Sequence, residues 1–190
     1  MQKLVVASGN LNKIKEIKEI LGDRYNIVSM QDVDCFVEVD ETGTTFEENA
    51  FLKAQAVYQK CKLPVIADDS GLIVDVLGDE PGVFSARYAG LPCDDAKNNE
   101  KLLAKLKNEK NRQARFVTCI VFFDGKNKIV GNGEADGIII DEYRGANGFG
   151  YDPIFFSREL NKTFGESSSA EKNRVSHRAR ALRDLMGKML

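Results

Sequence analysis

The sequence predicts an α/β protein built on a mixed β-sheet, and two observations lead to this fold class. In the early part of the chain, apolar strand-like runs alternate with helical patterns, beginning with an expected strand at 3–8 and an expected helix at 12–21. Later, the run RFVTCIVFF at 115–123 is followed by Asp124-Gly125 and by a second strand pattern from 128. This arrangement is typical of an antiparallel hairpin. Helix-linked strands and a hairpin together predict a mixed sheet.

The remaining elements are predicted from local signals. Thr45 with Glu48, and Ser168 with Glu171, fit capping boxes, which predict one helix from about Phe46 and another over 170–190. Pro64 ends the first of these helical segments. We further expect strands at 25–30, 65–67, 72–76, 128–130 and 134–140, a bulge or bend at Gly131 and Gly133, and a helix at 94–106.

The stretch VIADDSGLIV at 65–74 contains two adjacent carboxylates that are candidate functional residues. A buried strand is expected to end at Asp68-Asp69, and Ser70-Gly71 is expected to turn the chain back into a second strand. Adjacent carboxylates repel, and burial disfavours their charged forms. Mg²⁺, which prefers one or two carboxylates with phosphate oxygens and waters, would relieve this cost. A plain acidic turn is the alternative, and these residues alone leave it open.

Composition excludes several classes of protein. The chain has 190 residues and a net charge of −2, which gives no general reason to expect nucleic-acid or membrane binding. Its length suits one large domain or two small lobes. We find no run apolar enough to span a bilayer and no signal-peptide pattern at the start. The four cysteines form no CxxC pair, so we expect free thiols, no zinc knuckle and a cytoplasmic location.

Two further segments are candidate ligand sites. SGNLNK at 8–13 lies where a strand leads into a helix, and unpaired N–H groups at such a helix start favour anions. Lys13 adds a positive charge there, although an ordinary connection with a surface lysine is the alternative. The glycine-rich RGANGFGYDPIFF offers Phe149 for stacking on a flat ring, unless its aromatic residues only fill the core. His177 is the only histidine, and a lone helix histidine is more often a surface or capping residue.

Taken in order, four blocks closely resemble the inosine triphosphate pyrophosphatase family, also called the non-canonical purine nucleoside triphosphate pyrophosphatases. The resemblance covers nearly the whole chain. The first block has Ser8 where threonine is common in the family, which keeps the hydroxyl group. The blocks are SGNLNK at 8–13, ETGTTFEENAFLKA at 41–54, ADDSGLIVDVLGDEPGVFSARYAG at 67–90, and GFGYDPIFF with EKNRVSHRA at 148–156 and 171–179.

The resemblance implies a single pyrophosphatase domain over 1–190, with a long mixed sheet, flanking helices and two lobes around a central cleft. It implies Mg²⁺-dependent hydrolysis of ITP, dITP and XTP to the monophosphate and pyrophosphate, which keeps deaminated purines out of DNA and RNA. The implied partners are a purine nucleoside triphosphate substrate and a second copy of the chain in a homodimer.

The resemblance also implies roles for individual residues. Asp69 matches the catalytic base, Glu41 and Asp69 match the metal ligands, and Ser70 contacts substrate. The implied phosphate-binding residues are Ser8, Gly9, Asn10, Leu11, Asn12 and Lys13. The implied nucleoside and base pocket comprises Phe149, Gly150, Tyr151, Asp152, Lys172, His177 and Arg178. The roles of Asp68 and Lys53 stay open.

The chemistry of the residues agrees with this hypothesis. Lys13, Lys53, Lys172 and Mg²⁺ supply the positive charge that a triphosphate needs. Arg178 is a donor-only side chain, which suits the 6-keto oxygen of hypoxanthine or xanthine and disfavours the 6-amino group of adenine.

Rival hypotheses are a house-cleaning pyrophosphatase for other modified nucleotides and a non-catalytic nucleotide-binding module. An oligomerisation domain is a third, but it leaves the polar blocks unexplained. The presence of both Glu41 and Asp69 argues against the non-catalytic module.

Overall fold

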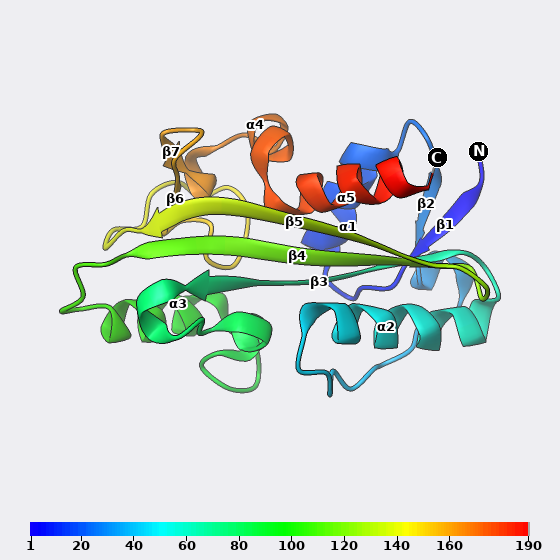
Figure 1. Ribbon diagram of the computed structural model, residues 1–190, viewed down its shortest axis with the longest axis horizontal. Coiled ribbons are helices and arrows are strands. Elements are labelled where there is room, and N and C mark those ends of the chain that lie inside the picture. Colours follow the sequence, from blue (N-terminus) through cyan, green and yellow to red (C-terminus); the bar gives the residue numbers. More distant parts are fainter. Residues whose placement is uncertain (190) are drawn as a thin grey trace. The chain divides into compact units, whose positions relative to one another are not determined.

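The computed structural model describes residues 1–189 and contains a seven-stranded sheet with flanking helices (Figure 1). The strand order is β2-β1-β3-β4-β5-β6-β7. Strand β1 pairs in parallel with β2 and β3, whereas β6 pairs antiparallel with β5 and β7. The predicted α/β fold with a mixed sheet is therefore confirmed.

The bounds of the elements agree with most of the ranges expected from the sequence. The strands are β1 Lys3–Val6, β2 Asn26–Ser29, β3 Val65–Val74, β4 Gln113–Phe123, β5 Lys128–Ile139, β6 Phe155–Ser157 and β7 Lys162–Thr163. The α-helices are α1 Leu11–Leu21, α2 Phe46–Cys61, α3 Asp95–Lys105, α4 Ser169–Val175 and α5 His177–Lys188.

The chain divides into two compact units. The first unit comprises residues 1–69, 118–133 and the chain from Arg178 onward, and the second unit comprises residues 70–117 and 134–177. The chain passes from one unit to the other within β3, β4 and β5 and near the start of α5. Each unit has its own hydrophobic core.

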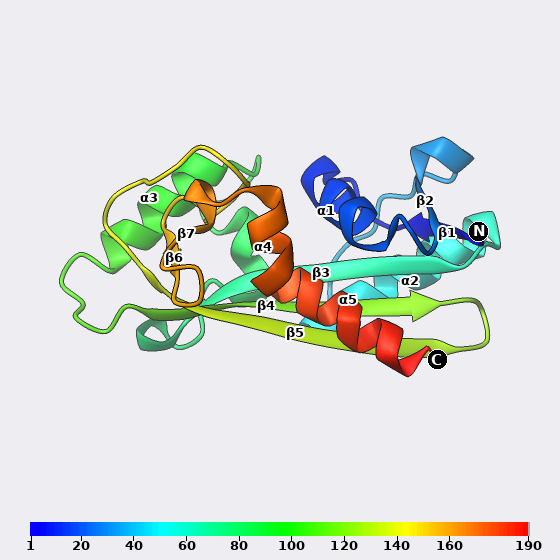
Figure 2. The same cartoon turned by 90° about the horizontal axis from the view of Figure 1, so that it is seen from above.

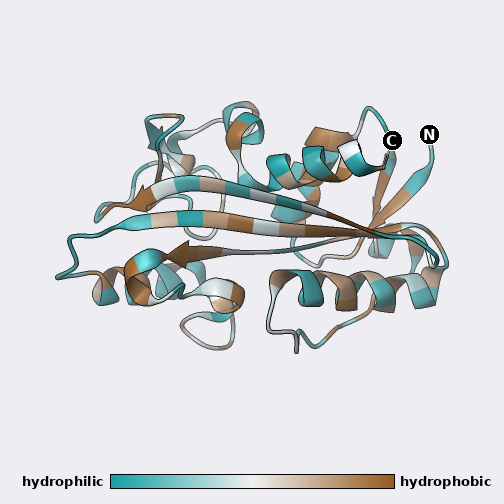
Figure 3. Ribbon diagram, in the orientation of Figure 1, coloured by the Kyte–Doolittle hydropathy of each residue, from teal (hydrophilic) through white to brown (hydrophobic). Residues whose placement is uncertain are grey.

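In the first unit, the alternation of side chains along β1 separates two core layers. Leu4 and Val6 pack with residues of α1 and α5, whereas Val5 and Ala7 pack with residues of α2. Successive side chains of a strand point to opposite faces, so α2 covers one face and α1 with α5 covers the other. Figure 3 shows hydrophobic and hydrophilic residues alternating along α2, as expected for a helix with one buried face.

In the second unit, the core is rich in aromatic rings. Phe116 lies with its ring centroid 4.6 Å from that of Phe155 and 5.9 Å from that of Phe164. All three are buried together with Leu102, in the last turn of α3, and with Leu106, which directly follows that helix. Such pairs add stabilisation beyond the area that they bury.

The predicted turn at Ser70-Gly71 is wrong. Strand β3 continues through Asp68, Asp69, Ser70 and Gly71 as one ten-residue element. The local pattern favoured a turn, but the two carboxylates are stabilised in an extended strand by lysine and arginine side chains from other elements.

The predicted helix over 170–190 is in fact two helices. Helices α4 and α5 are separated by Ser176, which has an extended backbone with ψ of 153°. Leu190, the last residue of the predicted helix, lies outside the described residues. Both predicted capping boxes are present, at Thr45 with Glu48 and at Ser168 with Glu171.

The strands predicted separately at 128–130 and 134–140 are in fact one continuous strand, β5, which contains Gly131 and Gly133. The bulge or bend expected at these glycines stays a prediction. A side chain at Gly131 would collide with the carbonyl oxygen of Ala181 and lie 2.6 Å from Cβ of Leu185. Glycine therefore allows α5 to approach β5, and the two elements run side by side in Figures 1 and 2.

None of the helices formed by residues 1–189 is both long enough and apolar enough to cross a membrane.

We expect Gly131→Ala to lower the free energy of unfolding by about 1–3 kcal/mol, because the added methyl group overpacks the contact between β5 and α5. Gly187→Ala is the matched control, since a Cβ there meets no atom within 4 Å and alanine favours a helix. Urea unfolding of both variants is the measurement. Equal stability of Gly131→Ala and the wild type would contradict the close packing.

Candidate active site

A fully buried carboxylate, Asp68, joins three elements of the first unit. Lys13 Nζ of α1 lies 2.6 Å from Asp68 Oδ1, and Arg178 Nε of α5 donates to Asp68 Oδ2 at 2.8 Å. The Arg178 guanidinium also donates through Nη1 to Glu16 of α1. The Asp68 and Arg178 side chains are 0% and 1% exposed, so this is a buried ion network.

The network fixes the charge state of Asp68. Burial alone would raise the pKa of the Asp68 carboxyl, but the charges of Arg178 and Lys13 outweigh it and hold that pKa well below its usual range. Burial lowers the pKa of Lys13, an effect that the charge of Asp68 opposes. Asp68 is therefore an ionised anchor and not a group that exchanges protons near neutral pH.

Asp69 belongs to a second cluster, built around Lys53 of α2. Lys53 Nζ lies 2.9 Å from Asp69 Oδ1, 2.8 Å from Glu41 Oε1 and 2.8 Å from the carbonyl oxygen of Asp68. The charges of Asp69 and Glu41 outweigh the effect of burial and raise the pKa of Lys53. The ammonium group therefore holds the two predicted metal-binding carboxylates close together.

The two carboxylate oxygens of Asp69 differ in their hydrogen bonding. Asp69 Oδ2 is buried and has no hydrogen-bond partner within residues 1–189. Burial raises the pKa of Asp69 above its usual value, although the charge of Lys53 opposes this rise. An unpartnered carboxylate oxygen is costly, which is typical of a group kept for binding or proton transfer.

The loop that carries Glu41 is held by the first turn of α2. Asn49 is fully buried, and its Oδ1 accepts a hydrogen bond from Gly43 N at 2.8 Å. Glu48 Oε2 accepts hydrogen bonds from the backbone N–H groups of Thr44 and Thr45. These contacts tie the segment just after Glu41 to the helix that carries Lys53.

The segment at 8–13 forms an exposed turn at the start of α1. Asn10 caps the helix, because its Oδ1 accepts hydrogen bonds from Asn12 N and Lys13 N. The expectation that all N–H groups here are unpaired is therefore wrong for these two. Ser8 and Gly9 line a cavity of about 210 Å³ together with Glu41 and Lys53, so the turn shares this cavity with one carboxylate of the pair and with the lysine that bonds both.

The glycine-rich loop of the second unit is ordered by Asp152. Asp152 Oδ2 accepts hydrogen bonds from Phe149 N at 2.9 Å and from Lys172 Nζ at 2.6 Å. The Lys172 ammonium also lies 4.9 Å from the centroid of the Phe149 ring. Four of the predicted nucleoside-pocket residues (Phe149, Gly150, Asp152 and Lys172) thus lie in one local arrangement.

Two other predicted pocket residues of the second unit pack inward. The Tyr151 ring is buried, and its hydroxyl donates to the carbonyl oxygen of Ser85 at 2.8 Å. The His177 ring stacks on Phe116, with centroids 4.7 Å apart and an interplanar angle of 14°. Ser70 lies half-buried in β3.

Sequence reasoning missed Glu16, the acidic partner of Arg178. It lies on the buried side of α1 with Ile14 and Ile17, although its charge suggests a solvent-exposed position. The only signal was its position one turn after Lys13, where both side chains reach the same side of the helix.

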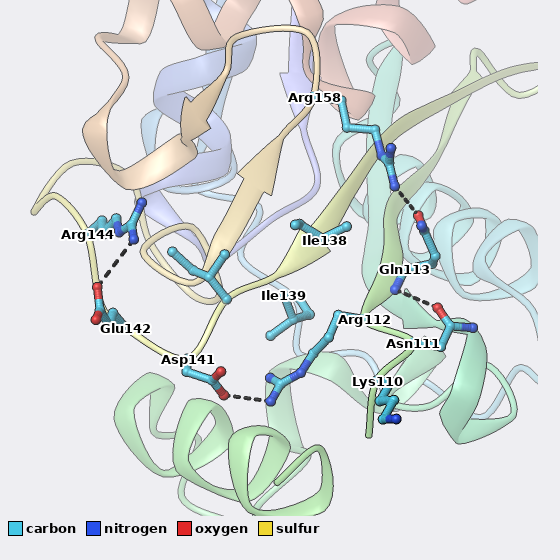
Figure 4. A pocket seen from close by; sticks show the side chains of 11 residues that line it. Lys110, Asn111, Arg112, Gln113, Ile138, Ile139, Asp141, Glu142, Arg144 and Arg158 are labelled. Atoms are coloured by element: carbon cyan, nitrogen blue, oxygen red, sulfur yellow. Dashed lines mark hydrogen bonds and ion pairs between the residues drawn. The ribbon is translucent and has the colours of Figure 1, made fainter. Parts of the chain in front are cut away.

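A larger, open depression in the second unit contains none of the candidate residues. It has a volume of about 700 Å³ and is lined by charged and polar side chains and by Ile138, Ile139 and Ile140 (Figure 4). Arg112 pairs with Asp141, Arg144 with Glu142, and Arg158 donates to Gln113. The candidate chemistry therefore lies elsewhere in the fold.

Comparison with known proteins identifies the family. The model of the Ham1 family matches residues 4–188. The chain belongs to the Ham1 family. A protein of Haemophilus influenzae called dITP/XTP pyrophosphatase is 48% identical over 99% of each chain, and one of Clostridium perfringens with the same name is 49% identical over 97% of this chain and 96% of its own. The family expected from the sequence is thus confirmed.

Solved structures of the Ham1 family have the same fold. The Ham1 protein of Staphylococcus aureus has a TM-score of 0.88 and 43% identity, and covers 99% of this chain and 98% of its own. A HAM1 protein of Coxiella burnetii has a TM-score of 0.89 and 37% identity, and covers 100% of this chain and 98% of its own.

The two adjacent aspartates of β3 should differ in their effect on stability. We expect Asp68→Asn to lower the free energy of unfolding by about 3–5 kcal/mol, because it removes the buried negative charge that Lys13 and Arg178 share. Asp69→Asn should cost less than about 1 kcal/mol, since its carboxylate is unfavourably buried and Lys53 keeps Glu41. Chemical denaturation at pH 7 is the measurement.

The acid dependence provides the control for this prediction. The pKa of Asp68 is lower in the folded than in the unfolded chain, where it is about 3.9. Its stabilisation is therefore fully present above about pH 4 and is lost as the pH falls below that value. Asp68→Asn should show a flatter loss of stability below about pH 4, and an unchanged slope would contradict the ion network.

Gly148 and Gly150 allow a matched test of the glycine-rich loop. Both have positive φ, 75° and 61°, but a Cβ at Gly148 would collide with Asp152 Oδ2, whereas one at Gly150 meets nothing within 4 Å. Each alanine should carry the backbone cost of about 1–2 kcal/mol. Gly148→Ala should lower the melting temperature further than Gly150→Ala, and equal shifts would contradict the close approach of Asp152.

Proposed function

We propose that this Ham1-family chain hydrolyses the deaminated purine nucleoside triphosphates ITP, dITP and XTP to the monophosphate and pyrophosphate. The observation that carries the proposal is the carboxylate pair of Glu41 and Asp69, bridged by Lys53 beside the exposed turn at 8–13. Full-length similarity to proteins called dITP/XTP pyrophosphatase supports the same reaction.

The turn at 8–13 is the proposed phosphate site. Ser8 to Asn12 are exposed or half-buried at the start of α1, where the helix dipole favours anions. Lys13 lies in the next position, and Lys53 lines the same cavity as Ser8 and Gly9. These groups are preorganised by Asp68 and Asp69, so they need little rearrangement to meet a polyphosphate.

Glu41 and Asp69 suit a hard divalent cation such as Mg²⁺. No group of three histidine, cysteine or acidic side chains suited to a metal occurs within residues 1–189. Mg²⁺, however, is bound in many phosphate-transfer sites by one or two carboxylates together with substrate phosphates. The unpartnered Asp69 Oδ2 fits this role. When bound, the ion would neutralise charge on the phosphates.

Asp69 is the proposed general base. Its raised pKa brings the carboxylate closer to the range in which it accepts a proton from water. In the proposed reaction, the water oxygen bonds to the α-phosphorus as its proton moves to Asp69, and the bond from the α-phosphorus to the bridging oxygen breaks. The products are the nucleoside monophosphate and pyrophosphate.

Phe149, Lys172 and Asp152 are the proposed contacts of the nucleoside. The Phe149 ring offers an aromatic surface, and Lys172 is held beside it by Asp152. Arg178 is proposed to donate to the 6-keto oxygen. Because its Nε, Nη1 and Nη2 atoms already donate to Asp68 or Glu16, it would have to share these donors with the base.

The remaining expectations stay part of the proposal. They are a single catalytic domain over 1–190 with two lobes around a cleft, assembly as a homodimer, a cytoplasmic location, and no nucleic-acid or membrane partner.

Pyrophosphate release from a panel of common and deaminated nucleoside triphosphates tests the function. We expect ITP, dITP and XTP to be hydrolysed in preference to ATP by tenfold or more, since an unmatched buried hydrogen-bonding group costs about 1–3 kcal/mol. Glu41→Gln and Asp69→Asn should each lose most activity while circular dichroism shows the wild-type fold.

The same panel separates the rival functions. Preference for other modified nucleotides would indicate a different house-cleaning pyrophosphatase. Tight binding of ITP without release of pyrophosphate would indicate a non-catalytic module. Full Mg²⁺-dependent turnover by Glu41→Gln or Asp69→Asn would contradict the roles given to these carboxylates.

A further inference from the structure

We propose that Asp95 and Asn99, in the first turns of α3, are positioning residues for nucleoside recognition, which act by clamping Gly150. The proposal rests on the function given above, because the glycine-rich loop is assigned there to the nucleoside. Neither side chain is placed in contact with substrate. Both would act through the loop residues that are.

The clamp holds both polar groups of a single residue. Gly150 N donates to Asp95 Oδ2 at 2.8 Å, and Asn99 Nδ2 donates to the carbonyl oxygen of Gly150 at 3.0 Å. Asp95 and Asn99 are four residues apart in a helix, so their side chains lie on the same face. This face of α3 therefore fixes the position and the direction of the Gly150 backbone.

Gly150 needs such a clamp because it has no side chain to pack. Its φ is 61°, and a Cβ built there would meet no atom within 4 Å. Its neighbours are anchored separately, Phe149 by its N–H bond to Asp152 and Tyr151 by its hydroxyl bond to Ser85. Because Phe149 is joined to Gly150 along the chain, a shift of Gly150 would displace Phe149 despite its bond to Asp152, and the Phe149 ring lies next to the Lys172 ammonium.

Burying the Asn99 side chain carries a free-energy cost that its own hydrogen bonds do not fully offset. It is 3% exposed, and its Oδ1 is buried without a hydrogen-bond partner in the part of the chain that the structure describes. A buried amide with one unmet group destabilises the fold. Such local costs are typical of functional positions.

The same helix provides a matched control. Asn98 is 2% exposed. Its Oδ1 accepts a hydrogen bond from Ala89 N at 2.7 Å, and its Nδ2 donates to the carbonyl oxygen of Ala86 at 2.9 Å. Asn98→Ala thus removes a buried amide of equal size from the next position of α3 without touching Gly150. It reports the general effect of weakening this helix.

The test measures the binding of inosine monophosphate and of pyrophosphate separately, by titration calorimetry. Asn99→Ala and Asp95→Ala should each weaken binding of inosine monophosphate about tenfold and leave pyrophosphate binding unchanged. Asp95→Asn keeps an acceptor oxygen and should bind both ligands as the wild type does. Asn98→Ala should leave the ratio of the two affinities unchanged.

Hydrogen exchange of the Gly150 amide gives a readout independent of any ligand. Exchange should be faster in Asp95→Ala than in the wild type, and unchanged in Asn98→Ala. Because Asp95 is exposed, its alanine variant is expected to fold.

Three outcomes would overturn the proposal. These are wild-type binding of inosine monophosphate by both alanine variants, equal weakening of both ligands, or the same selective loss in Asn98→Ala. If the wild-type protein hydrolyses ITP and only the clamp variants behave unexpectedly, the positioning role fails and the function stands. If the wild type neither binds inosine monophosphate nor hydrolyses ITP, both fail.

Discussion

The buried charge of Asp68 is the constraint on which the first unit depends. Lys13 of α1 and Arg178 of α5 both bond this carboxylate, although more than fifty residues separate it from either partner. A buried charge without a partner costs several kcal/mol, so the charged residues of all three elements are stable only together. The same contacts place Lys13 at the start of α1, where the phosphate site is proposed. The contacts that stabilise the first unit therefore also position a residue of the proposed phosphate site.

The alternation of a β-strand explains how two adjacent aspartates avoid mutual repulsion. Successive side chains of β3 point to opposite faces of the sheet, so Asp68 meets Lys13 and Arg178 while Asp69 meets Lys53, which also bonds Glu41. Their environments move their pKa values in opposite directions, down for Asp68 and up for Asp69. One carboxylate is thereby fixed as an anion, and the other is left with an unpartnered oxygen for chemistry.

The sequence predicts features that depend on local interactions, and it misses features that depend on contacts between residues far apart in the chain. Capping boxes are local, and both predicted ones occur at the expected residues. The turn expected at Ser70-Gly71 failed because partners from α1, α2 and α5 stabilise an extended strand there, and no local pattern records them. The clamp on Gly150 was missed for the same reason, since α3 and the glycine-rich loop are about fifty residues apart.

The charge balance of the first unit gives a physical reason to expect a divalent cation with the substrate. The ion pairs around Asp68 and Asp69 include three cations and four carboxylates, and these seven side chains together carry a formal net charge of −1. A triphosphate would be repelled by this excess, whereas a bound divalent cation reverses its sign. Lys53 alone cannot do so, because its charge already serves two carboxylates. The three cations are Lys13, Lys53 and Arg178, and the four carboxylates are Glu16, Glu41, Asp68 and Asp69.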